Sequence, residues 1–271
     1  MKTWIKFSKV LAASAALLMT APVVTVAHAA AVTSEAAVSE AAPASETAPA
    51  EAAGAEAPAP ALLAHQKPLE LDLASSSFVF LSTALVLMMT LPGLALFYGG
   101  MVRKKNVIAT VTQSVAVSCV AGLLWYVVGY SLSFGVADKA LFGLPAETVN
   151  KFIGGFDTVL LKGVTKETAF NLAPGLPEML WISYQMTFAI ITPALITGAF
   201  AERIKLSGLL LFMALWSVFV YAPICHQVWG GSFMGSMGVL DFAGGAVVHV
   251  NSGVAGLVAA LFLGRRKGYG T

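Results

Sequence analysis

Two ionisable residues, Asp241 and His249, stand at the start of the last apolar stretch of the 271-residue chain. His249 lies well inside the apolar run Phe242–Leu263, and Asp241 immediately precedes that run. An ionisable group within a membrane-spanning helix costs free energy that packing does not require, so His249 is a functional candidate. An imidazole can also relay a proton near neutral pH. The alternative, a histidine that only hydrogen-bonds a neighbouring helix, stays open.

Asp241 has two interpretations of its own. A carboxylate at this position can cap a helix, because it accepts hydrogen bonds from free backbone N–H groups and complements the helix dipole. It can equally be a fixed negative charge that favours a cation at an entrance. Both roles are compatible with the sequence Asp241–Phe242 followed by small residues.

Aromatic residues accompany these two groups near the ends of earlier apolar runs. Trp229 directly follows the fourth run, and Phe188 lies about a third of the way into the third run, after Tyr184. Aromatic faces attract a cation by about 0.5–2 kcal/mol. An interfacial aromatic belt is the alternative explanation for Trp229. Together with an acid they suit a small cation, whereas His226 is expected at the interface or vestibule without an assigned role.

The elements that must position these residues are membrane-spanning helices. The composition is 58% hydrophobic and only 11% charged, and five apolar runs approach the roughly 20 residues that a bilayer core requires. The runs contain no lysine or arginine and cover Phe78–Tyr98, Val107–Phe134, Met179–Phe200, Leu206–Val228 and Phe242–Leu263. The sequence therefore predicts an all-α membrane protein. Pro92-Gly93 should bend or break the first helix near its end.

Basic residues between the runs predict the orientation. They concentrate after the first, third and fifth runs, at Arg103–Lys105, Arg203–Lys205 and Arg265–Lys267. The positive-inside rule places these loops in the cytoplasm and the mature N-terminus outside. We therefore expect a multi-pass protein of the bacterial inner membrane with a periplasmic mature N-terminus.

The region before the first run divides into two segments. Residues 1–30 have a basic start, a short apolar stretch and the small-residue site Ala27–Ala29, which predicts a cleaved signal peptide rather than an anchor. Residues 31–77 are rich in alanine, proline and acidic residues, and they predict a disordered acidic linker. Partial helix is the alternative. The third segment, 78–271, holds the membrane helices.

Three motifs resemble the ammonium transporters of the Amt/Mep/Rh family. Leu91–Gly100 (LPGLALFYGG) is similar to the end of the family's first helix, and Gly198–Arg203 (GAFAER) to its third-to-fourth helix loop. Asp241–His249 (DFAGGAVVH) resembles the family signature. The motifs follow one another in the family's order across residues 78–271, and that order is more specific than any single motif.

The resemblance implies roles for four residues. Phe188 and Trp229 would form the aromatic pair of the outer ammonium recruitment site, with Phe188 also guarding the pore. Asp241 would be the acid needed for recruitment and helix structure, and His249 the first of two pore histidines. Ammonium would be deprotonated and pass as neutral ammonia, because an apolar pore penalises a bare ion.

The same resemblance implies an architecture and partners. The family fold has eleven helices in two inverted five-helix repeats plus one, assembled as a homotrimer, and this chain holds the first repeat. A PII-type signal protein on the cytoplasmic face is a candidate partner besides ammonium and the lipid bilayer. Neither a nucleic acid nor a cofactor is expected, since the net charge is +2 and the two cysteines offer no metal-ligand spacing.

We find no second copy of the repeat within the chain, so we expect these 271 residues alone not to conduct. An ammonium sensor or a non-conducting regulatory membrane protein is the alternative function, since the acidic linker could bind a partner. A membrane enzyme using His249 would need a nucleophile or metal ligands in the membrane, and the sequence offers neither. The protein is therefore not expected to be an enzyme.

Overall fold

The structure is a computed structural model that describes residues 62–141, 143–266 and 268. The predicted signal peptide, 1–30, and the linker as far as residue 61 lie outside these residues. Within the described part, five helical segments are long and apolar enough to cross a membrane, which confirms the five predicted spans. They cover Leu73–Gly100, Lys104–Phe134, Glu178–Phe200, Leu206–Ser236 and Gly245–Leu263.

Four of these five segments include a π turn. The main helices are α2 (Leu73–Met88), α3 (Ala95–Gly100), α4 (Val107–Leu124), α5 (Tyr130–Phe134), α7 (Glu178–Phe200), α8 (Leu206–Trp216), α9 (Ala222–Val228) and α11 (Asn251–Leu263). The π turns are Met89–Leu94, Trp125–Gly129, Ser217–Tyr221 and Gly245–Val250.

The predicted bend at Pro92 takes the form of the first π turn. Pro92 lies inside Met89–Leu94, between α2 and α3. Proline lacks the N–H that would continue the α-helical hydrogen-bond ladder, and a wider turn accommodates the missing donor. The first span therefore stays one continuous helical segment rather than breaking.

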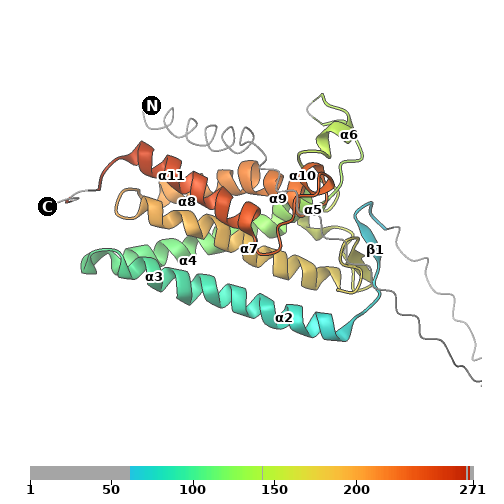
Figure 1. The fold of residues 1–271 in the computed structure, drawn as a ribbon, viewed down its shortest axis with the longest axis horizontal. Helices are drawn as coiled ribbons and strands as arrows, with labels where there is room; N and C mark the ends of the chain where they lie inside the picture. Colours follow the sequence, from blue (N-terminus) through green and yellow to red (C-terminus); the bar gives the residue numbers. More distant parts are fainter. Residues whose placement is uncertain (1–61, 142, 267, 269–271) are drawn as a thin grey trace, which may run out of the picture. The chain divides into compact units, whose positions relative to one another are not determined.

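The spans run alongside one another, and α7 lies among them (Figure 1). It packs against α2, α4 and α11, and more than half of its residues are buried. The outermost helix, α2, has no buried residue, and its Phe78 and Phe80 are 71% and 72% exposed. An apolar surface of this kind is stable only against lipid or further protein, which is consistent with membrane insertion.

One end of the bundle carries the short elements. Strand β1 (Gln66–Pro68) pairs antiparallel with β2 (Thr168–Phe170), with Gln66 opposite Phe170. Figure 1 shows β1 at the same end as α6 (Ala146–Val149) and α10 (Phe233–Ser236). We call this the β1 end. The prediction of an all-helical chain thus needs one addition, a two-stranded sheet.

The expected disorder of 31–77 does not extend to its last part. Residues 66–68 form β1, and α2 begins at Leu73, where the Asp72 carboxylate accepts hydrogen bonds from the N–H groups of Ala74 and Ser75 at 2.9 and 3.2 Å. The composition of the segment concealed this order. Its strand is stabilised by a partner about a hundred residues later in the chain, and local propensity does not register such a partner.

The opposite end of the bundle is held by charged loops, and we call it the Arg203 end. Arg103, before α4, forms an ion pair with Glu202 after α7, with Nε 3.0 Å from Oε1. Asn106 also donates to that oxygen at 2.6 Å. The hydrogen bonds from Arg103 and Asn106 lower the pKa of Glu202 to about 2. Two of the three predicted basic loops therefore contact each other.

Candidate functional site

Asp241 caps the fifth span. Its Oδ1 accepts a hydrogen bond from the N–H of Ala246 at 3.2 Å, and its Oδ2 accepts one from Val247 at 3.0 Å. The intervening Gly244 has φ of 70°, and a Cβ there would lie 2.9 Å from Cγ2 of Val248. The span consequently begins at Gly245 and not at Phe242 as predicted, because the carboxylate and the left-handed glycine form the turn that starts it.

Trp229 is positioned by the same residue. Its indole Nε1 donates to the backbone carbonyl oxygen of Asp241 at 3.1 Å, across the loop between α9 and the fifth span. The carboxylate of Asp241 therefore caps the helix while its carbonyl fixes the indole. Sequence reasoning placed the two residues in one recruitment site without a contact between them, and the structure joins them directly.

Phe188 meets Trp229 from α7. The ring centroids are 5.4 Å apart with an interplanar angle of 69°, an edge-to-face contact. Tyr184, one turn earlier on α7, lies edge-to-face on Phe188 with centroids 4.9 Å apart. The predicted aromatic pair is thus a cluster of three, which we call the aromatic cluster (Tyr184, Phe188 and Trp229). Its members are all partly exposed.

Tyr184 had no role in the sequence prediction, although a signal was present. It stands four residues before Phe188, and residues four apart lie on the same face of a helix. Any helix that turns Phe188 towards a vestibule therefore turns Tyr184 in a similar direction. A phenol ring adds both an aromatic face and a hydroxyl to the surface that a cation would meet.

His249 lies in the π turn Gly245–Val250, and its side chain is exposed. Its backbone N–H donates to the carbonyl of Gly244 at 2.9 Å. The ring makes no hydrogen bond to any residue within the described ranges. An exposed imidazole on an otherwise apolar helix is a group that still needs a partner. Within the described ranges, His249 is therefore not a core histidine whose ring is hydrogen-bonded by a neighbouring helix.

His226 differs from the prediction of an interfacial or vestibule residue. It is 3% exposed, and its Nδ1 and Nε2 lie 3.1 and 2.9 Å from the carbonyl oxygens of Ser133 and Asn150. The ring therefore ties α9 to the end of α5 and to the loop after α6. The sequence could not show this role, because both partners are backbone atoms of distant segments.

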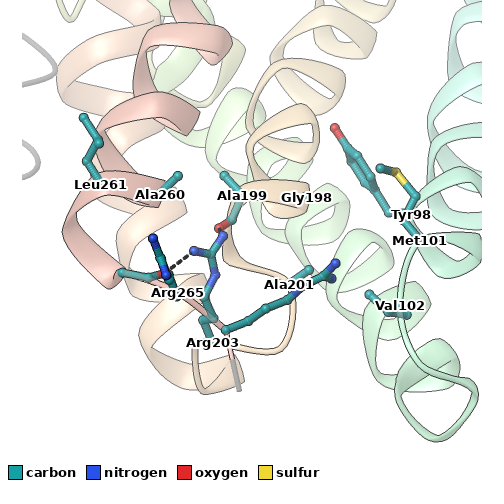
Figure 2. A pocket seen from close by; sticks show the side chains of 12 residues that line it. Tyr98, Met101, Val102, Gly198, Ala199, Ala201, Arg203, Ala260, Leu261 and Arg265 are labelled. Atoms are coloured by element: carbon teal, nitrogen blue, oxygen red, sulfur yellow. Dashed lines mark hydrogen bonds between the residues drawn. The ribbon is translucent and has the colours of Figure 1, made fainter. Parts of the chain in front are cut away.

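A cavity of about 600 Å³ opens at the Arg203 end (Figure 2). Tyr98 and Met101 line one side, and Ala260 and Leu261 of α11 line another. Figure 2 shows Arg203 reaching from the turn after α7 towards the end of α11. Its guanidinium donates to the carbonyls of Ala199 and Gly264, near the C-terminal ends of two helices, where a cation is favourable.

Sequence comparison now decides the family. The model of the Ammonium Transporter Family matches residues 77–271. The chain belongs to that family. It is 46% identical over 205 residues to an ammonium transporter of Aquifex aeolicus and 44% identical over 197 residues to one of Bacillus subtilis, covering 75% and 73% of this chain. Members of this family are transporters and not enzymes.

Solved structures agree with the sequence matches. Mep2 of Candida albicans superposes with a TM-score of 0.62 at 34% identity, and Mep2 of Saccharomyces cerevisiae with 0.61 at 34%. These matches cover 73% of this chain but 40% and 41% of those chains. The chain likewise spans 45% of the Aquifex and Bacillus relatives. It is a multi-pass membrane protein that corresponds to roughly the first half of an ammonium transporter.

Proposed function

We propose that this chain supplies the ammonium-recruiting half of a transmembrane ammonium transporter. The observation that carries the proposal is the direct link between the aromatic cluster and Asp241, through the 3.1 Å hydrogen bond of the Trp229 indole. Asp241 and the three aromatic rings are then connected to one another at the start of the span that carries His249. Cation–π attraction and a nearby carboxylate suit a small monovalent cation such as ammonium.

The chemistry after recruitment follows from the cost of charge in an apolar pore. A bare ammonium ion would lose its hydration without a compensating partner, whereas the free-energy cost of moving neutral ammonia into the pore is far lower. Transfer of the ammonium proton to water near the aromatic cluster, followed by passage of ammonia, avoids that cost. The exposed imidazole of His249 can then accept or donate a hydrogen bond, and it can relay a proton at physiological pH.

The orientation belongs to the same proposal. Arg103, Arg203 and Arg265 lie at the Arg203 end, and the positive-inside rule places that end in the cytoplasm. The aromatic cluster would then face the periplasm of a bacterial inner membrane. With its second half the protein would form a homotrimer, and a PII-type protein would have the Arg203 end as its docking side. No observation on the described residues favours the alternative of an ammonium sensor.

Uptake of radiolabelled methylammonium by cells without their own ammonium transporter tests the proposal. Because the chain matches about half of its relatives, we would assay it alone and as a hybrid, in which the C-terminal part of the Bacillus subtilis relative follows Leu263. We expect the hybrid to take up methylammonium and the chain alone not to do so. A hybrid that inserts correctly and takes up nothing would refute the function.

Matched variants of the hybrid test the site itself. Trp229→Leu should raise the half-saturating concentration about three- to tenfold, as expected when a cation–π contact of roughly 1 kcal/mol is lost. Tyr126→Leu removes an aromatic side chain that is 51% exposed in the second span and takes no part in the ring contacts of the aromatic cluster. This control should leave uptake unchanged. Equal effects of the two substitutions would argue against the recruitment role.

A further inference from the structure

A buried polar cluster at the β1 end has no part in the function proposed above. His65 is 1% exposed, and its Nε2 lies at hydrogen-bond distance, 3.2 Å, from Oε1 of Glu178. Its Nδ1 lies at ion-pair distance, 3.3 Å, from Oδ2 of Asp157. Glu178 is completely buried. When each ring nitrogen of an imidazole faces a carboxylate, both nitrogens can donate a proton. This arrangement favours the doubly protonated, charged form of the ring.

Glu178 also accepts hydrogen bonds from two further side chains. The hydroxyl of Tyr130 donates to Oε1 at 2.8 Å, and the side-chain amide of Gln66 donates to Oε2 at 2.7 Å. Among the described residues, the ion pairs of Asp157 and Glu178 both go to His65. Burying a carboxylate without a counter-charge costs free energy. The charged form of His65 supplies that counter-charge and so stabilises the ionised side chain of Glu178 at this position.

The cluster joins four parts of the chain that are distant in sequence. His65 and Gln66 precede the first span, Asp157 lies in the loop between the second and third spans, and Glu178 is the first residue of α7. Tyr130 of α5 completes it, with its ring 6.2 Å from that of His65 in an edge-to-face contact. The titratable groups that face His65 are therefore Asp157, Glu178 and Tyr130.

The placement of α7 connects this cluster to the recruitment site. Phe188 lies ten residues beyond Glu178 on the same helix, about 15 Å away at 1.5 Å per residue. Trp229 belongs to a different segment and is held by Asp241. The contact between the two rings, with centroids 5.4 Å apart, therefore depends on where the N-terminal end of α7, which we call its outer end, is held.

We propose that His65 is a positioning residue for ammonium recruitment: as an imidazolium between Asp157 and Glu178, it holds the outer end of α7 so that Phe188 meets Trp229. The inference rests on the proposed function for its consequence on uptake. Loss of the proton would leave two carboxylates sharing one uncharged ring, and the end of α7 would move to admit water to Glu178.

The pKa of His65 sets the pH at which its proton is lost and the end of α7 moves. Burial opposes the charged form, but the contacts with Asp157 and Glu178 outweigh burial and raise the pKa of His65 from 6.5 to about 9. A raised pKa means that the stabilisation is complete below pH 6.5 and is lost as the pH rises through about 9. The contacts of His65 that hold α7 should therefore persist at neutral pH and be lost under alkaline conditions.

A distance measurement on the 271-residue chain in lipid nanodiscs tests the hold without any transport. Spin labels at Met179→Cys on α7 and Phe233→Cys on α10, with Cys119→Ser, report the position of the outer end of α7. All three positions are exposed. We expect the distance distribution to change between pH 7 and pH 10 with a midpoint near 9. His65→Gln should show the changed distribution at both pH values.

Lys67→Gln is the matched control, because it removes one positive charge from the neighbouring exposed position. It should keep the transition of the unsubstituted chain. A distribution that does not respond to pH, or that responds equally in His65→Gln, would overturn the positioning role. This outcome does not depend on whether the protein transports ammonium.

Uptake by the hybrid supplies the second readout. At a constant concentration of methylammonium cation, His65→Gln should raise the half-saturating concentration roughly threefold at pH 7, as a partly lost cation–π contact would. The maximal rate should change less. A variant that only lowers the amount of folded protein would reduce the maximal rate and keep the half-saturating concentration, contrary to the inference. A hybrid without uptake, but with the distance change, would refute the proposed function and leave the hold on α7 intact.

Discussion

At the scale of single residues, Asp241 combines two roles that the sequence left as alternatives. The structure shows the capping role directly, since both carboxylate oxygens accept backbone hydrogen bonds from the first turn of the fifth span. The attraction of a cation remains part of the proposed function. Capping and attraction differ in what they need: capping needs an acceptor, whereas attraction needs the charge.

Asp241→Asn separates these roles. An asparagine oxygen can still accept one of the two hydrogen bonds, so we expect a loss of stability of about 1 kcal/mol, within the usual range for caps. Ammonium uptake by the hybrid should fall much more than the melting temperature suggests. Asp72→Asn is the control, because Asp72 caps α2 through the same kind of contacts. Similar uptake in both variants would show that the charge at 241 is dispensable.

The same scale shows what sequence reasoning reached and what it missed. Phe188, Trp229 and Asp241 were predicted as a group, and the structure brings them into contact. His65 was assigned to a linker, because its partners lie 92 and 113 positions away and no periodic pattern connects them. Hydropathy identifies what is buried in a span, but it carries no information about polar contacts between loops.

At the scale of elements, hydropathy predicted all five spans and misplaced only their ends. The fifth starts three residues later than predicted, because a carboxylate cap and a left-handed glycine precede it. The π turns were not predictable, apart from the irregularity at Pro92, since a π turn depends on packing rather than on composition. Element type was therefore secure from sequence, and local helix geometry was not.

Gly198 provides a test of how closely these elements pack. A Cβ at this position on α7 would lie 2.5 Å from a ring carbon of Tyr98, which itself donates to the carbonyl of Leu195 at 2.7 Å. Gly198→Ala should lower stability by about 1–3 kcal/mol through overpacking, measured as a lower melting temperature. The control Gly253→Ala has open space around its Cβ. It should be neutral or slightly stabilising, and the opposite order would contradict the packing.

At the scale of the whole molecule, the described chain presents surfaces that a membrane protein would cover. His249 is exposed although it belongs to a span, and Leu257 and Leu261, about two and three turns further along the same span, are 57% and 76% exposed. The chain covers about 45% of the length of its relatives, and under the proposed function the second half of the transporter would be the neighbour on this side. The sequence indicated a pore-facing side for His249 only through the family resemblance, because no local pattern shows which helix face remains uncovered.

Chemical modification of His249 should report that neighbour. In the chain alone, diethylpyrocarbonate should modify His249 readily, and in the hybrid the modification should be slowed at least severalfold. Peptide mass spectrometry measures both rates, and His226, which is 3% exposed, serves as the internal control that stays protected in both. Equal reactivity of His249 in the two proteins would mean that the second half does not cover this face.

The hydrogen bond from the Trp229 indole to the carbonyl oxygen of Asp241 has an evolutionary consequence. Every amino acid carries that carbonyl, so a substitution at position 241 that preserves the turn can change the local charge without moving the indole. The charge at position 241 and the position of the Trp229 ring can therefore change independently. Under the proposed function, a descendant of this protein could change its affinity for cations through the side chain at position 241, while the position of the Trp229 indole stays the same.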